Sequence, residues 1–236
     1  MNELLTCTGL TKQYGSKAAL DNLNLTLPRG RIIGLLGPNG SGKTTLIKLI
    51  NGLLAPTAGQ LYINGNEPGP DTKKVVSYLP ERTYFNSWMK VNDILDFFCD
   101  FYADFRRNRA EDTLQRLGID PTARLSTMSK GTKEKVQLIL VMSRNAQLYL
   151  LDEPIGGVDV EAREHVLDLI LENFNPKGTM LIVTHLIHDI ERLFDDVIVL
   201  KEGRVETFTA SDSLRAQYGG SLEEALKAMF REEAAR

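Results

Sequence analysis

The stretch "RIIGLLGPNGSGKT", residues 31–44, decides how this chain of 236 residues folds. Its first half is an apolar run without polar alternation, which is typical of a strand covered on both faces of a sheet. Its second half matches the pattern G-x-x-x-x-G-K-[ST] at every fixed position, from Gly37 to Thr44. A strand that leads through glycines into a helix is the context that this pattern requires. The stretch therefore predicts a phosphate-binding loop at the carboxyl end of a buried strand.

Small residues and backbone N–H groups explain how such a loop binds phosphate. Gly37, Gly40 and Gly42 allow backbone angles and a close approach that side chains would block. Successive N–H groups, together with the N-terminus of the following helix, then point at phosphate oxygens. We expect Lys43 to reach the β- and γ-phosphates and Thr44 to ligate Mg²⁺. The other residues of the loop that we expect to contact nucleotide are Pro38, Asn39, Ser41 and Thr45.

A second run, "LYLLDEP" at residues 148–154, supplies the partner of the phosphate loop. Its apolar residues predict a buried strand with Asp152 and Glu153 at the carboxyl end, where open parallel sheets bind ligands. Asp152 is expected to hold Mg²⁺, and Glu153 is expected to act as general base on an attacking water. An Asp-Glu pair at a strand end is otherwise often a helix cap, and the phosphate loop favours the catalytic interpretation.

Apolar runs of the same kind recur along the chain. Besides the two above, they are found at residues 75–80, 179–185 and 197–203. Between the runs lie stretches with helical patterns, at residues 44–54, 93–105, 110–117, 133–143, 160–174 and 186–194. Strands that alternate with helices predict an α/β fold with a mainly parallel sheet. The pair Asn64-Gly65 favours a tight hairpin and so predicts an antiparallel β piece near the N-terminus.

Residues from about 85 to 145 interrupt this alternation, because they contain helical patterns and no clear strand. We therefore expect one domain over residues 1–236, with an α/β core and an inserted helical subdomain. Its expected parts are the core at 1–84 and 146–210, the helical subdomain at 85–145 and a C-terminal helical extension at 211–236. Ser221 and Glu224 have the spacing of a capping box at the start of the last helix.

Composition excludes several classes of function. The net charge of -3 and a pI of about 5.7 give no strongly basic face, so no nucleic-acid partner is expected. Cys7 and Cys99 lie far apart and have no metal or disulfide spacing, which favours two buried or idle thiols in a reducing cytosol. The N-terminus lacks the features of a signal peptide. No run approaches the roughly 18 apolar residues of a membrane-spanning helix, so we expect a soluble, cytoplasmic chain.

Over about residues 3–210 the sequence resembles the ATP-binding subunits of ABC transporters. Tyr14 of "KQYGSKAAL" looks like the aromatic residue that stacks on adenine, and "GPNGSGKTT" and "LYLLDEP" resemble the two nucleotide-binding motifs. "SYLPERTYF" stands in the place of the Q-loop, with Glu81 where the family has glutamine, and "MSKGT" at 128–132 stands in the place of the signature. Asp159 of "GGVD" looks like the D-loop aspartate, and His185 of "VTH" looks like the switch histidine.

The resemblance implies a P-loop NTPase fold with a RecA-like core sheet and an inserted α-helical signature subdomain. It implies an ATPase with ATP and Mg²⁺ as cofactors, in which Glu153 and His185 are catalytic and Thr44, Glu81 and Asp152 surround the metal. It also implies two kinds of partner: a membrane-spanning permease, and a second ATPase subunit that is identical or a paralogue. The chain would then lie on the inner face of the cell membrane as a peripheral subunit.

Two departures from the family pattern narrow the resemblance. They are Glu81, and the signature Met128-Ser129-Lys130-Gly131-Thr132 in place of Leu-Ser-Gly-Gly-Gln. Both look like those of bacterial ABC-2-type exporter ATPases of the antibiotic and multidrug class. We therefore expect an exporter, with Ser129, Lys130 and Gly131 near ATP on the second subunit. The stretch "TMSKGTKEKV" would equally suit an ordinary capped helix that acts within its own chain.

Other functions remain open at this point. A soluble ABC ATPase acting on the ribosome or on DNA is the main alternative, but translation-type members usually carry two ATPase units in one chain, and this chain has one. Repair-type members insert a long coiled coil between the two ATPase motifs, and no sustained heptad run lies there. A GTPase or small-molecule kinase is more distant, since the chain has no Asn-Lys-x-Asp motif.

The aromatic stretch after Glu81 also has two interpretations. Tyr84, Phe85, Trp88 and Met89 are bulky residues in a loop-like context. They are expected either to form part of the core of the helical subdomain or to form an apolar docking surface for the permease, since exposed aromatics mark interfaces.

Overall fold

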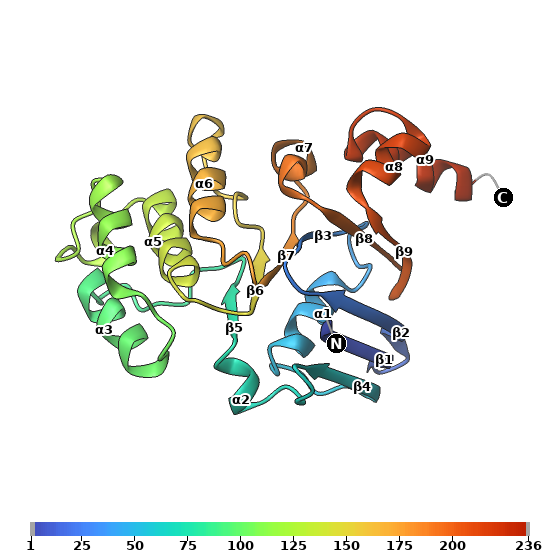
Figure 1. Ribbon diagram of the computed structural model, residues 1–236, viewed down its shortest axis with the longest axis horizontal. Helices are drawn as coiled ribbons and strands as arrows, with labels where there is room; N and C mark the ends of the chain where they lie inside the picture. Colours follow the sequence, from blue (N-terminus) through green and yellow to red (C-terminus); the bar gives the residue numbers. More distant parts are fainter. Residues whose placement is uncertain (1–2, 235–236) are drawn as a thin grey trace.

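Two β-sheets form the framework of the computed structural model, which describes residues 3–234 (Figure 1). Residues 1–2 and 235–236, the ends of the expected first and last segments, lie outside the described residues. Figure 1 places the helices of residues 91–142 at one end of the molecule and the C-terminal helices at the other. Between them run the strands that carry the two nucleotide-binding motifs.

The larger sheet has six strands in the order β5-β6-β7-β3-β8-β9. The first five are parallel to one another, and β9 pairs antiparallel with β8 at the edge. The strands are β3 (Ile32–Leu36), β5 (Val76–Leu79), β6 (Leu148–Asp152), β7 (Thr179–Val183), β8 (Asp196–Lys201) and β9 (Arg204–Ala210). The five apolar runs thus form the predicted parallel sheet, and the α/β fold class is confirmed.

The smaller sheet is antiparallel and has the order β2-β1-β4. It consists of β1 (Glu3–Tyr14), β2 (Lys17–Pro28) and β4 (Ala58–Ile63). The predicted antiparallel piece is confirmed, but the pair Asn64-Gly65 does not join two of its strands. Both residues have positive φ angles, 52° and 75°, and their turn closes only an isolated bridge between Ile63 and Asn66. β4 pairs instead with the distant β1.

Helices occupy the predicted stretches, with shifted ends, and the short helix α2 (Pro70–Lys73) was not predicted. They are α1 (Lys43–Ile50), α2 (Pro70–Lys73), α3 (Val91–Phe101), α4 (Arg107–Arg116), α5 (Lys130–Met142), α6 (Val160–Asn173), α7 (Ile187–Ile190), α8 (Ser211–Tyr218) and α9 (Leu222–Ala234), with short 3-10 turns η1 (Leu125–Thr127) and η2 (Glu191–Leu193). The capping box before α9 is confirmed. The Ser221 N–H donates to Glu224 Oε2 at 2.9 Å, and the Glu224 N–H donates to Ser221 Oγ at 3.2 Å.

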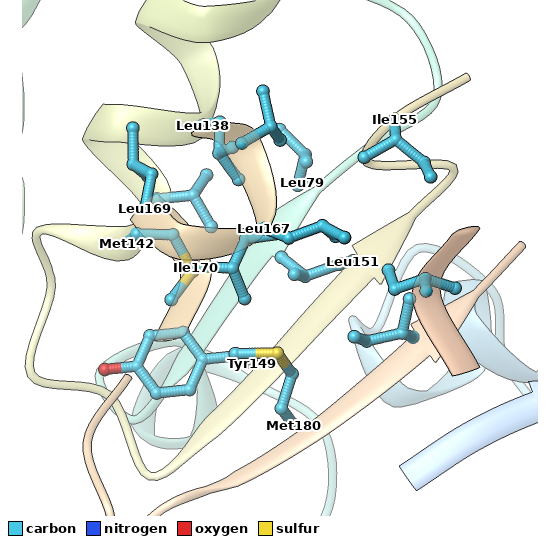
Figure 2. Packing of buried hydrophobic residues seen from close by; sticks show 14 of the residues in the cluster. Leu79, Leu138, Met142, Tyr149, Leu151, Ile155, Leu167, Leu169, Ile170 and Met180 are labelled. Atoms are coloured by element: carbon cyan, nitrogen blue, oxygen red, sulfur yellow. The ribbon is translucent and has the colours of Figure 1, made fainter. Parts of the chain in front are cut away.

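The core has two parts, one on each face of the six-stranded sheet. On one face, Leu35 and Leu150 pack with α1 and the antiparallel sheet. On the other face, Tyr149 and Leu151 of β6 pack with α5 and α6, as Figure 2 shows. Because successive side chains of a strand point to opposite faces, apolar cover on both faces requires runs without polar alternation. These runs end together at one edge of the sheet, where the loops that follow β3, β6 and β7 meet.

Candidate nucleotide-binding site

Two glycines allow the phosphate loop to lie close to neighbouring backbone. Gly37 has a φ angle of 143°, and a Cβ atom there would lie 2.1 Å from the Leu200 carbonyl oxygen. Gly42 has a φ angle of 106°, and a Cβ atom would lie 2.4 Å from the Ala19 carbonyl oxygen. Any side chain at either position would push the loop away from β8 or β2. The loop therefore needs glycine at these two positions for packing as well as for approach to phosphate.

Lys43, the first residue of α1, turns back over the loop. Its Nζ donates to the carbonyl oxygens of Gly37 at 2.8 Å and Pro38 at 2.9 Å. Burial lowers the pKa of Lys43, and the negative charges of Glu153 and Asp152 oppose that shift. Lys43 is thus held near two carboxylates, in a position from which an ammonium group can bind phosphate.

A pocket of about 490 Å³ opens beside the loop. The predicted residues that line it are Tyr14, Asn39, Gly40, Gly42, Lys43, Thr44, Thr45, Glu81, Asp152, Glu153 and His185, joined by Lys17, Ala19 and Val183, which were not predicted. Tyr14 lies exposed at the end of β1, and Lys12 Nζ lies 5.5 Å from the centre of its ring. Three residues of the predicted loop do not line the pocket. Gly37 and Pro38 accept hydrogen bonds from Lys43 Nζ through their carbonyl oxygens, and Ser41 is buried.

Asp152 is the most buried carboxylate of the pocket, with 6% of its surface exposed. Its pKa is raised from 3.8 to about 6, first by burial and then by the charges of Glu153 and Glu81, while Lys48 and Lys43 act in the opposite direction. A bound cation would offset this crowding of negative charge.

Thr44 and Asp152 fit a magnesium ion. Both line the same pocket, and hydroxyl and carboxylate oxygens are the ligands that Mg²⁺ prefers. Within residues 3–234, no three His, Cys, Asp or Glu side chains converge on a site that could hold a metal by themselves. Mg²⁺ usually binds through one or two protein oxygens together with phosphates and water, so two protein donors suffice here.

Glu153 follows Asp152 directly, but its backbone turns sharply. Its φ angle is 54°, which is uncommon for a residue other than glycine. The turn brings its half-buried carboxylate to the end of β7. There Oε2 accepts a hydrogen bond from Thr184 Oγ1 at 3.1 Å, and Oε1 accepts one from the His185 N–H at 3.1 Å. The carboxylate is therefore held in one orientation at the pocket wall.

His185 also contacts Glu153 through its ring, with Nδ1 at 2.8 Å from Oε1. An ionised carboxylate only accepts hydrogen bonds, so this contact places a hydrogen on Nδ1 and leaves Nε2 for the pocket. Thr184 was not predicted as a site residue. Its signal in the sequence is a hydroxyl residue beside His185 at the end of an apolar run.

None of the signature residues lines this pocket. Ser129 is the N-cap of α5, and its Oγ accepts a hydrogen bond from the Thr132 N–H at 3.1 Å. Lys130 and Gly131 begin the helix, with Lys130 Nζ at 3.7 Å from Glu134 Oε1. Asp159 is the N-cap of α6. The capped helix is thus present, and Ser129, Gly131 and Asp159 line no part of the pocket in their own chain.

The two interpretations of the aromatic stretch, a core position and an exposed surface, each hold for part of it. Phe85 and Met89 are half-buried and pack against the core. Tyr84 and Trp88 are 52% and 61% exposed, so the expectation of a core position is wrong for these two. A groove of about 500 Å³ lies here, lined by Tyr84 together with Leu53, Phe98, Tyr102 and others.

Comparison with known proteins places this geometry in a family. The profile of the family described as ABC transporter matches residues 20–156. The uncharacterized ABC transporter ATP-binding protein MJ1023 of Methanocaldococcus jannaschii is 32% identical over 209 residues, which cover 86% of this chain and 76% of that protein. The daunorubicin resistance ATP-binding protein DrrA3 of Streptomyces coeruleorubidus is 30% identical over 224 residues, which cover 92% of this chain and 71% of that protein.

A solved structure agrees with these relatives. The ATP-binding subunit of an ABC transporter superposes with a TM-score of 0.86 at 29% identity, and the match covers 96% of this chain and 99% of that one. Among residues 3–234, no helix is long and apolar enough to cross a membrane. Residues 20–156, which the family profile matches, include both the phosphate loop and the Asp152-Glu153 pair. The chain belongs to the ABC transporter family, as an ATP-binding subunit that hydrolyses ATP to drive transport.

Proposed function

We propose that this chain is the ATPase subunit of an exporter, and that it drives a separate membrane-spanning permease from the cytoplasmic face of the membrane. In this proposal the core, residues 1–84 and 146–210, binds ATP. The helical subdomain, residues 85–145, carries the signature, and residues 211–236 are the C-terminal extension. Export is favoured by the two departures from the family pattern and by the similarity to a drug-resistance protein.

ATP would bind with its base against Tyr14 and its phosphates on the loop of residues 37–45. Lys43 would exchange its two carbonyl partners for the β- and γ-phosphates, a stronger set of acceptors for an ammonium group. Thr44 and Asp152 would hold Mg²⁺, with Glu81 close by. When bound, the ion neutralises phosphate charge and orients the γ-phosphate.

Glu153 would take a proton from the attacking water. Its hydrogen bonds from Thr184 and His185 keep the carboxylate at the pocket wall, and a general base must be held within reach of the proton that it abstracts. With Nδ1 bound to Glu153, the free edge of the His185 ring would contact the γ-phosphate. Hydrolysis would thus depend on two side chains that position each other.

A second ATPase subunit would complete the site. Ser129, Gly131 and Asp159 are exposed or half-buried at the N-termini of α5 and α6 and line no part of their own chain's pocket. Helix N-termini favour negative charge. The N-terminus of α5 would therefore meet ATP bound to the partner, with Lys130 adding a positive charge.

The observation that carries the transport proposal is the segment of residues 80–84, which reaches both sites. Glu81 lines the nucleotide pocket, and Tyr84, three residues later, lines the groove with exposed aromatic surface. A helix of the permease that docks in this groove would touch the same segment as the nucleotide. Binding of ATP and movement of the permease would then be linked through five residues.

The test is to co-express the chain with the membrane protein encoded beside it and to purify the pair in detergent. We expect co-purification and an ATPase rate above that of the isolated chain. A Glu153→Gln chain should co-purify equally well and lose hydrolysis, because the substitution keeps the shape and removes the base. Recovery of the chain alone, with an ATPase rate that the membrane protein does not change, would contradict the proposal.

A further inference from the structure

A second, smaller pocket of about 150 Å³ lies beside the nucleotide pocket. It is enclosed by α5, by the segment of residues 79–83 and by the loop of residues 153–157. It shares Glu81, Glu153 and His185 with the nucleotide pocket and adds Glu134 and Gln137 of α5. The mechanism described above uses neither of these two side chains.

Gln137 presents an unpaired oxygen to this pocket. The residue is only 3% exposed, and its Nε2 is 3.4 Å from the carbonyl oxygen of Pro80, to which it donates. That bond fixes the orientation of the amide, since the reverse orientation would set two acceptors against each other. Oε1 is buried and has no hydrogen-bond partner among the described residues. A buried acceptor without a partner indicates a missing donor or ion.

Glu134 presents a second such oxygen. Its Oε2 is buried and unpaired within the described chain. Its Oε1 has only a distant ion pair, at 3.7 Å, with Lys130, whose side chain is 82% exposed. The carboxylate lies directly against Gly157, where a Cβ atom would come within 2.3 Å of both of its oxygens. A carboxylate in this position lacks the close partner that a half-buried charge requires.

The charges around the pocket select the class of ligand. Three carboxylates, on Glu81, Glu134 and Glu153, line it together with one lysine, so a neutral water would satisfy the acceptors but leave the negative charge. The two pocket oxygens that are buried without a partner among the described residues are one carboxylate oxygen, of Glu134, and one neutral amide oxygen, of Gln137, a pair whose single negative charge matches a monovalent cation. Amide and backbone carbonyl oxygens are the ligands with which proteins replace the hydration shell of K⁺.

We propose that this pocket is a monovalent-cation site, in which Glu134 Oε2 and Gln137 Oε1 bind K⁺ beside the loop that carries Glu153. Backbone oxygens of the pocket and water complete the coordination. The ion neutralises Glu134 and fixes α5 against the loop of residues 153–157. The site lies within one chain and does not require nucleotide, a second subunit or the permease.

The test compares thermal unfolding of the nucleotide-free chain in KCl and in choline chloride at equal ionic strength, with EDTA present. We expect a higher midpoint in KCl, because a ligand at ten times its Kd raises the folding equilibrium constant about elevenfold. Gln137→Leu and Glu134→Leu keep a side chain of similar size and each remove one ligand, so both should lose the difference between the salts. Glu164→Gln removes an exposed charge on α6 and should keep it.

Binding can be followed directly with Tl⁺, which replaces K⁺ and is visible by ²⁰⁵Tl NMR. A bound Tl⁺ signal in the wild-type chain that is absent from Gln137→Leu supports the site. Equal midpoints in the two salts for the wild-type chain, as expected for a pocket that holds only water, would overturn it. So would a K⁺ effect that persists in both pocket variants or disappears in Glu164→Gln.

Discussion

Asp152 and Glu153 are adjacent in the chain but lie in different surroundings. Asp152 continues β6, is nearly buried and has its pKa raised to about 6. Glu153 turns out of the strand at a φ of 54° and is held by Thr184 and His185. Different environments give neighbouring carboxyl groups different tasks. Here the surroundings of Asp152 suit it to bind a metal ion, and those of Glu153 suit it to act on a water molecule.

The raised pKa of Asp152 makes the stability of the nucleotide-free chain depend on pH. A carboxyl whose pKa is higher in the folded chain stabilises the fold fully below the unfolded value of 3.8, and this contribution is lost as pH rises through about 6. The shift corresponds to about 3 kcal/mol. Asp152→Asn, which does not titrate, should therefore gain stability relative to wild type between about pH 4 and pH 7.

Chemical denaturation of both proteins at several pH values, with EDTA present, measures this difference in free energy of unfolding. Glu172→Gln, which alters an exposed carboxylate, is the control and should show no comparable trend. A difference between Asp152→Asn and wild type that stays constant with pH would contradict the assignment of burial as the cause of the shift.

Lys43 should carry much of the affinity for ATP. It is the cation of the phosphate loop, and hydrogen bonds to charged groups contribute about 1.5–3 kcal/mol. Lys43→Ala is therefore expected to weaken ATP binding about tenfold to a hundredfold by calorimetry. Lys48→Ala changes the same helix outside the pocket lining and is the matched control. Equal losses in the two variants would point to general electrostatics and against a direct contact.

At the scale of the elements, the sequence predicts the strands that are buried on both faces, because such strands must be apolar along their whole length. β3, β5, β6, β7 and β8 are apolar runs because helices or the second sheet cover each face, and the phosphate loop follows from its glycines. β9 was missed, because an edge strand whose residues are exposed or half-buried leaves no apolar run. α8 was missed as a separate element inside the predicted extension.

The candidate site likewise contains residues that could be predicted from the sequence and residues that could not. Residues inside a motif, such as Lys43 and Asp152, could be placed from the sequence because the motif fixes their position relative to a strand end. Thr184 could not, because its role depends on the backbone turn at Glu153, which brings β6 and β7 side chains together. The pairing of β1 with β4 was equally hidden, since 43 residues separate the two strands and the local turn at Asn64 pointed to a hairpin.

The exposed position of Trp88 changes what its removal should do. Trp88→Ala is expected to leave the thermal stability and basal ATPase rate of the isolated chain nearly unchanged, because the side chain contributes little to the core. Phe98→Ala, at a residue that is 3% exposed, should cost about 3–5 kcal/mol. In the complex with the permease, Trp88→Ala should reduce transport-coupled ATPase activity. A large loss of stability in Trp88→Ala would contradict its exposure.

At the scale of the whole molecule, the nucleotide pocket and the signature lie on different parts of one chain. The pocket follows the ends of β3, β6 and β7, whereas the N-terminus of α5 belongs to the helical end of the molecule. A single chain would therefore contribute to two proposed sites. Its pocket would form half of one site, and its signature would form half of the other. Two chains arranged head to tail would bring each signature to the partner's pocket.

The most direct test of this account is the molar mass of the Glu153→Gln chain with Mg·ATP, measured by light scattering. We expect this variant to bind ATP without hydrolysing it, so ATP should join two chains and double the molar mass, while the nucleotide-free protein stays monomeric. Adding Ser129→Arg to the same chain should keep ATP binding and prevent the doubling. If the Glu153→Gln chain stays monomeric with saturating ATP bound, the account of a site shared between two chains is contradicted.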